Sequence, residues 1–147
     1  MIFIHLIIGL ILGKLSGHTL LFVIASILPD IDHLYLLIKH KLFTKVKIID
    51  ALKHEEKYKI RFKTPLMHSI LGLLICTLIY YLTFNTNTIY FASAYLLHLL
   101  FDFSDIDKKQ FLYPLKYEFS GFLPIWSKTE QRLTLIFLII LAFLYSP

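Results

Sequence analysis

Residues 2–29 read IFIHLIIGLILGKLSGHTLLFVIASILP, and this stretch decides the fold class. It is apolar almost throughout, apart from an interruption at 13–18 that holds two glycines, a lysine, a serine and a histidine. One continuous helix over this stretch would be longer than a bilayer core needs, whereas helices over 2–12 and 19–29 would each rise about 16 Å, roughly half a bilayer. The glycine-containing interruption favours two short helices joined by a turn over the single long helix.

The rest of the chain has the same apolar character. Of its 147 residues, 57% are apolar and 17% are charged, and the mean hydropathy is +0.70. A soluble domain has about 45–50% apolar and about 25% charged residues. Three further apolar stretches lie at 66–84, 89–103 and 133–145. We therefore expect one all-α domain over 1–147, an integral membrane helical bundle of four to five helices whose first two form a short hairpin.

The cysteine content excludes two kinds of structural feature. Cys76 is the only cysteine in the sequence, so an intramolecular disulfide framework and a cysteine-based zinc site are both excluded.

Charge is concentrated in one segment. Residues 34–65 hold nine basic and three acidic residues, although the whole chain carries a net charge of only +5. A lysine-rich segment between apolar stretches is typical of a cytoplasmic loop, and it can also lie against anionic headgroups. No nucleic-acid motif accompanies it, so we expect no nucleic-acid partner. The aromatic and lysine residues of 104–132 are typical of a segment at headgroup level. We expect a multi-pass protein of the cell membrane with its basic loop in the cytoplasm.

Several ionisable residues lie near the ends of the apolar stretches. If the chain crosses in alternate directions, the following residues reach the same cytoplasmic face: His5, Asp30, Asp32, His68, His98 and Asp102. Ionisable groups beside apolar segments are costly and are therefore functional candidates. His98 and Asp102 are four residues apart and share one helix face. Imidazole and carboxylate together suit zinc, manganese or iron, so the set predicts a site for one or two divalent ions.

Each of these residues also has a simpler interpretation. A single histidine in an apolar helix is more often a hydrogen-bonded core residue, Asp30 can be a helix cap, and His98 with Asp102 can be a structural pair. The convergence of all six on one face favours metal binding. His33 can be a ligand, a proton shuttle or a partner of a ligand. The remaining histidines are expected to be solvated: His18, His40 and His54.

The motifs together resemble a known family. Leu28-Pro29-Asp30-Ile31-Asp32-His33, followed by His68-Ser69 and His98-x-x-x-Asp102 and preceded by His5, is similar to the pattern of the YdjM-like family. Its members are described as inner-membrane-associated, LexA-binding, metal-dependent hydrolases. That family is in turn similar to zinc-dependent phospholipases C and single-strand-specific zinc nucleases, which are helical enzymes that cut phosphodiester bonds.

The resemblance implies a ligand set and an activity. By it, the zinc ligands would be His5, Asp32 or Asp30, His68, His98 and Asp102, with Asp102 bridging. The further ligands that hold a third zinc ion in the soluble enzymes are not evident after Asp102, so one or two ions are expected. The implied activity is hydrolysis of a phosphoester or phospholipid by a metal-activated water. Asp30 or His33 is the expected catalytic proton carrier.

Two other functions remain open. A non-catalytic membrane adaptor or regulatory protein could use a structural metal and bind a soluble partner through 34–63. A closed site, with every metal position filled by protein, would support it. A transporter could use intramembrane histidine and aspartate as a proton or metal path, but the middles of 66–84 and 133–145 are apolar.

Overall fold

The regular structure is helical. The computed structural model describes residues 2–44, 46–47, 50–51, 64–124 and 127–146. Its main helical elements are α1 (Ile2–Ser16), α2 (Thr19–Ile27), the 3-10 turn η1 (Leu28–Asp30), α3 (Ile31–Lys39), α6 (Ile70–Phe84), α7 (Thr88–Ser104) and α8 (Lys128–Tyr145). Within these described ranges the only β-structure is a pair of isolated bridges between 105 and 123. The expected all-α class is confirmed.

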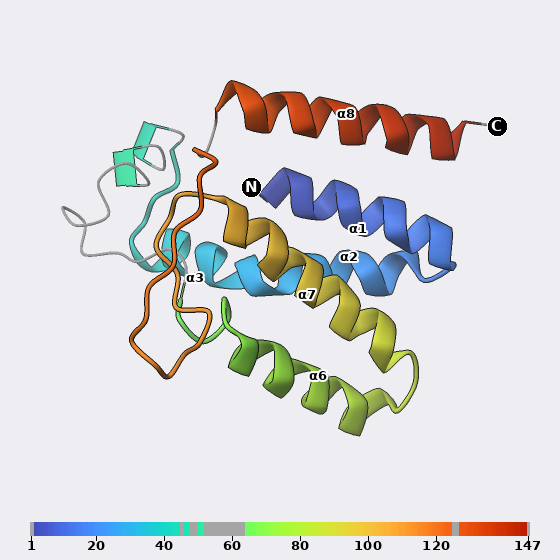
Figure 1. The fold of residues 1–147 in the computed structure, drawn as a ribbon, viewed down its shortest axis with the longest axis horizontal. Coiled ribbons are helices and arrows are strands. Elements are labelled where there is room, and N and C mark those ends of the chain that lie inside the picture. The colour runs from blue at the N-terminus through green and yellow to red at the C-terminus, as the bar shows by residue number, and fades with distance from the viewer. Residues whose placement is uncertain (1, 45, 48–49, 52–63, 125–126, 147) are drawn as a thin grey trace.

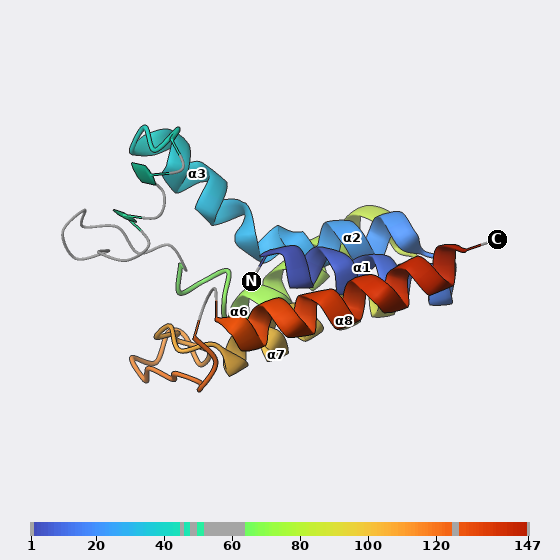
Figure 2. The ribbon, with the colours of Figure 1, turned by 90° about the horizontal axis from the view of Figure 1, so that it is seen from above.

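The helices form two antiparallel pairs and one added helix (Figure 1). α1 packs on α2, α2 packs on α7, α6 packs on α7, and α8 lies along α1. The α1–α2 and α6–α7 turns lie at one end of the bundle, and α3 extends beyond the other end (Figure 2). Four helix termini therefore meet at that second end: the starts of α1 and α6 and the ends of α2 and α7.

The predicted N-terminal hairpin is confirmed, but its first helix is longer than 2–12. α1 runs to Ser16, and the turn needs little more than Gly17, which takes a φ of +77°, and His18. Gly13 does not end the helix. A Cβ atom built there would lie 2.5 Å from the Cα of Thr19, so Gly13 lets the two helices approach closely.

The chain beyond Pro29 differs from the prediction. The sequence predicts an end of the helix near 29 and a loop from 34, whereas η1 leads directly into α3, which ends at Lys39. Proline is tolerated at the start of a helical turn because its missing N–H needs no partner there. The resulting 21-residue stretch Thr19–Lys39 is, among the described residues, the one helix that is long and apolar enough to cross a membrane.

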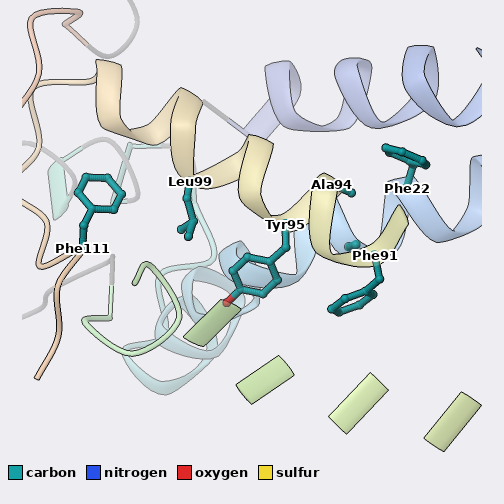
Figure 3. Packing of buried hydrophobic residues seen from close by; sticks show 7 residues of the cluster. Phe22, Phe91, Ala94, Tyr95, Leu99 and Phe111 are labelled. Carbon is teal, nitrogen blue, oxygen red and sulfur yellow. The ribbon is translucent and has the colours of Figure 1, made fainter. Parts of the chain in front are cut away.

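The buried core lies mainly between α2 and α7 (Figure 3). It contains Phe22, Ala25, Phe91, Ala94, Tyr95, Leu99 and Phe111. Outside this core the helices expose large apolar side chains, such as Leu82 on α6 and Phe143 on α8. α8, which is described over its whole length, buries none of its residues. Exposed apolar surface on this scale is typical of a protein that contacts lipid or a partner.

A segment after α7 closes the second end of the bundle. Its Lys109 is 2% exposed and its Asp105 is 0% exposed. The Lys109 ammonium donates to the Asp105 carboxylate and to the carbonyl oxygens of Asp105 and Asp107. The carbonyl of Phe111 accepts the N–H of Ile70, at the start of α6. The segment is thereby fixed against the residues that lead into α6.

Replacing Gly13 by alanine should destabilise the hairpin. The added Cβ would meet backbone atoms of Thr19 at 2.5 and 3.1 Å, and relieving such overpacking typically costs about 1–3 kcal/mol. We expect the midpoint of thermal unfolding in detergent to fall by several degrees. Leu15→Ala is the matched control, because Leu15 is 65% exposed on the same helix. Equal midpoints for G13A and the wild type would contradict the close approach.

Candidate metal centre

The predicted site residues do converge at one end of the bundle. α1 contributes His5, η1 contributes Asp30, α3 contributes Asp32 and His33, the turn before α6 contributes His68, and α7 contributes His98 and Asp102. All of them except His33 are buried. The six ionisable residues expected at a common face therefore lie at the same end of the described bundle.

The Asp102 carboxylate lies among three imidazoles. Its Oδ1 is 3.2 Å from Nε2 of His5. Its Oδ2 is 3.5 Å from Nε2 of His68 and 3.6 Å from Nε2 of His98. The two oxygens thus face different histidines.

Asp30 forms a second centre of contacts. Its Oδ1 is 3.3 Å from Nδ1 of His33, 3.6 Å from Nε2 of His68 and 3.8 Å from Nε2 of His98. His68 and His98 therefore lie between the two carboxylates of Asp30 and Asp102. The rings of His5 and His98 stack with centroids 3.8 Å apart.

A backbone carbonyl fixes the orientation of His98. Nδ1 of His98 is 2.7 Å from the carbonyl oxygen of Ser26. Because a carbonyl only accepts, Nδ1 carries a proton and donates it, and Nε2 faces Asp30 and Asp102. A histidine that ligates a metal through one nitrogen usually donates a hydrogen bond through the other.

Asp32 is placed differently from the other two aspartates. Its Oδ2 accepts the backbone N–H and the hydroxyl of Thr64, both at 2.8 Å. The same oxygen is 3.4 Å from Nδ1 of His68. Asp32 therefore faces Nδ1 of the His68 ring, whereas Asp30 and Asp102 face Nε2.

Several buried polar atoms of the cluster have no hydrogen-bond partner within the described part of the chain. They are Nδ1 of His5, Oδ2 of Asp30, Oδ1 of Asp32, both ring nitrogens of His68 and Nε2 of His98. Leaving buried polar atoms unsatisfied costs free energy. A divalent ion would satisfy such donor atoms, since carboxylate and neutral imidazole are both metal ligands.

The spacing of these atoms fits a small divalent ion. Three groups have ligand atoms that all lie within 4.8 Å of one another: His5 with Asp30 and His98, Asp30 with His33 and His68, and His68 with His98 and Asp102. Two ligands of a tetrahedral zinc ion, each about 2.0–2.1 Å from the metal, lie roughly 3.4 Å apart. The contacts of 3.2–3.8 Å between these carboxylates and imidazoles match that separation.

The carboxylates also change the protonation of His68. Burial opposes a charge on this ring, but the close carboxylates of Asp30, Asp32 and Asp102 outweigh burial and raise the pKa of His68 to about 9. In the metal-free protein at neutral pH, His68 is therefore protonated and offsets part of the negative charge of the cluster.

The other histidines lie elsewhere. His18 lies in the α1–α2 turn at the opposite end, with its ring 4.3 Å from that of Tyr90. His40 is exposed after α3, and His54 and most of the basic segment lie outside the described residues. Sequence reasoning missed Thr64 and the Ser26 carbonyl as partners of the cluster. A backbone carbonyl leaves no signal in a sequence, and nothing about Thr64 pointed to Asp32.

These features define a helical bundle with exposed apolar helix faces and a buried histidine–aspartate cluster at one end. The chain belongs to the YdjM inner membrane protein family, whose model matches residues 2–146. The resemblance seen in the motifs is thereby confirmed for the family, and the family description places the chain among inner membrane proteins. No curated protein and no solved structure matches the chain.

The raised pKa of His68 predicts a pH dependence for the metal-free protein. A pKa that folding raises from 6.5 to about 9 contributes stability that is fully present below pH 6.5 and is lost as the pH rises through 9. We expect the melting temperature of chelator-treated protein to fall between pH 6.5 and 9. His68→Gln, which cannot be protonated, should flatten that slope. An equally steep slope for H68Q would show that another group is responsible.

Proposed function

We propose that this protein is a membrane-bound, metal-dependent hydrolase that cleaves a phosphoester, with phospholipids as the first substrates to test. The observation that carries the proposal is the set of three overlapping ligand groups, in which Asp30, His68 and His98 each belong to two groups. Shared ligands of this kind suit one ion or two adjacent ions. Paired ions about 3.5–4 Å apart are a common device for hydrolysing phosphate esters.

The proposed ligands are His5, Asp30, His68, His98 and Asp102. Zinc is the first choice of metal, because three imidazoles and two carboxylates with no cysteine suit its nitrogen and oxygen coordination. Asp102 is the best candidate for a bridging ligand, since its Oδ1 faces His5 while its Oδ2 faces His68 and His98. A bound ion would supply activated water and a positive charge for the phosphoryl oxygens.

His33 is the proposed route for protons. It is the one site residue that is partly exposed, with 25% of its side chain accessible, and its Nδ1 is 3.3 Å from Oδ1 of the buried Asp30. A histidine that links a buried carboxylate to the outside can carry a proton to a leaving oxygen and exchange it with solvent. Asp30 and His33 are thus the proposed acid–base pair.

The proposed orientation places the cluster near headgroups on the cytoplasmic side. Support comes from the bundle itself, because the cluster and the start of the basic segment lie at the same end, while both short interhelical turns lie at the other (Figure 1). The exposed apolar faces of α6 and α8 suit contact with lipid chains. We propose a multi-pass topology with the basic segment cytoplasmic and 104–132 at headgroup level.

A second candidate function is a non-catalytic membrane adaptor that uses the metal for folding. The depth of the cluster favours it, because His5, His68, His98 and Asp102 are all only 1–2% exposed. A structural site has every position filled by protein, whereas a catalytic site keeps one for water. The two functions therefore make the same prediction for metal binding and opposite ones for hydrolysis.

Replacing His98 or Asp102 by alanine should remove bound metal and, with it, phosphodiester and phospholipid hydrolysis. We expect activity to fall by more than the roughly 10–100-fold that is typical when a residue hydrogen-bonded to a metal ligand is replaced. Elemental analysis of detergent-purified protein gives the ions per chain, and vesicle phospholipids and a soluble phosphodiester serve as substrates. His40→Ala is the control, because His40 is exposed and follows the last residue of α3. A wild-type protein that holds no metal after mild purification would rule out the enzyme.

His33→Gln should separate proton transfer from metal binding. We expect the variant to keep its ions but to lose about 10²–10⁴-fold in turnover, the usual worth of a general acid or base. Metal loss in H33Q would instead make His33 a ligand. Full metal content in the wild type with no hydrolysis of either substrate would favour the adaptor.

A further inference from the structure

We propose that Asp32 and Tyr95 are positioning residues that hold the turn carrying His68 against the metal cluster, and that Asp32 is not itself a ligand. One of the two tests of this inference, the measurement of metal binding, rests on the proposed metal site, and the other does not. The need for such residues follows from where His68 lies. The other proposed ligands are on α1, η1 and α7, whereas His68 lies in the irregular segment 64–69. Ligands on such segments are less precisely placed than ligands on helices unless other groups fix them.

Asp32 fixes one side of this turn to α3. Its Oδ2 accepts two hydrogen bonds from Thr64 at 2.8 Å and approaches Nδ1 of His68 at 3.4 Å. With Nδ1 toward Asp32, Nε2 of the same ring faces Asp30 and Asp102 at 3.6 and 3.5 Å. This is the arrangement of a histidine oriented by a carboxylate behind it and ligating in front. Asp32 also belongs to none of the three groups of close ligand atoms.

Tyr95 fixes the other side of the turn to α7. Its side chain is fully buried, and its hydroxyl donates to the carbonyl oxygen of Met67 at 2.7 Å. Figure 3 shows the ring pointing from α7 toward the start of α6. Tyr95 lies three residues before His98 and seven before Asp102, so one face of α7 carries the proposed anchor and both ligands. The residue preceding His68 is thus tied directly to the helix that supplies His98 and Asp102.

The packing around the Tyr95 hydroxyl leaves little freedom. A Cβ atom on Gly72 would lie 2.1 Å from the carbonyl oxygen of Leu66 and 3.2 Å from the Tyr95 hydroxyl. The turn has local bonds of its own, from the Ser69 hydroxyl to the Leu66 carbonyl at 2.7 Å and from the Gly72 N–H to the Ser69 hydroxyl at 3.1 Å. Loss of the Tyr95 hydroxyl would leave those local bonds in place and remove an attachment to α7.

The first test measures metal binding by the full-length protein in detergent. Asp32→Asn and Tyr95→Phe should keep the wild-type number of zinc ions at saturation but weaken affinity about 10–100-fold, as measured by competition with a chromophoric chelator. Their cobalt-loaded forms should keep the wild-type absorption pattern, because the ligands are unchanged. Tyr90→Phe, on the same helix beside His18 at the other end, should bind like the wild type. Asp102→Asn, a ligand variant, should lose an ion or alter the cobalt spectrum.

The second test needs no metal. In chelator-treated protein, hydrogen exchange of residues 64–72 should be faster in Tyr95→Phe and Asp32→Ala than in the wild type, and unchanged in Tyr90→Phe. Faster exchange in a protein that binds no metal would defeat the proposed function and leave the positioning role intact. Wild-type exchange and wild-type affinity in both variants would overturn the positioning role. Loss of an ion at saturation in D32N would overturn it for Asp32, by making that residue a ligand.

Discussion

The end of the bundle depends on the pairing of buried carboxylates with imidazoles. Removing a carboxylate from water costs several kcal/mol even after the surroundings relax, and Asp30, Asp32 and Asp102 are each less than 8% exposed. Each of them lies against histidine rings, and Asp32 also accepts two hydrogen bonds from Thr64. The close carboxylates raise the pKa of His68, so its protonated ring supplies positive charge among them, and a bound ion would supply that charge instead. Either way, positive charge must lie among these residues for the end of the bundle to close.

The close approach of α2 and α7 supports the arrangement of this cluster. α2 and α7 bring the small side chains Ala25 and Ala94 into the core between them, and the Ser26 carbonyl comes within 2.7 Å of the His98 ring. Larger residues at the two alanine positions would separate the helices and move the Ser26 carbonyl away from His98. The apolar packing in the middle of the bundle and the polar cluster at its end are therefore parts of one arrangement.

The sequence predicts the hairpin and the meeting of the six ionisable residues, because both follow from apolar runs that reverse direction at polar turns. Its errors occur where a local signal competes with packing. Gly13 looks like a helix end but allows close contact with Thr19. Pro29 looks like a stop but lies within a 3-10 turn that continues into α3. The helix expected from 66 starts at Ile70, because the residues before it form the His68 turn. The contacts from Ser26 and Met67 use backbone oxygens, which any residue would provide.

The unequal exposure of the cluster limits how it can work. His5, His68, His98 and Asp102 are buried, whereas His33 is partly exposed in the first turn of α3. His33 is therefore the member of the cluster that solvent reaches, and it contacts the buried Asp30. The hydrogen bonds from Thr64 to Asp32 hold the His68 turn against α3 at this partly exposed side of the cluster.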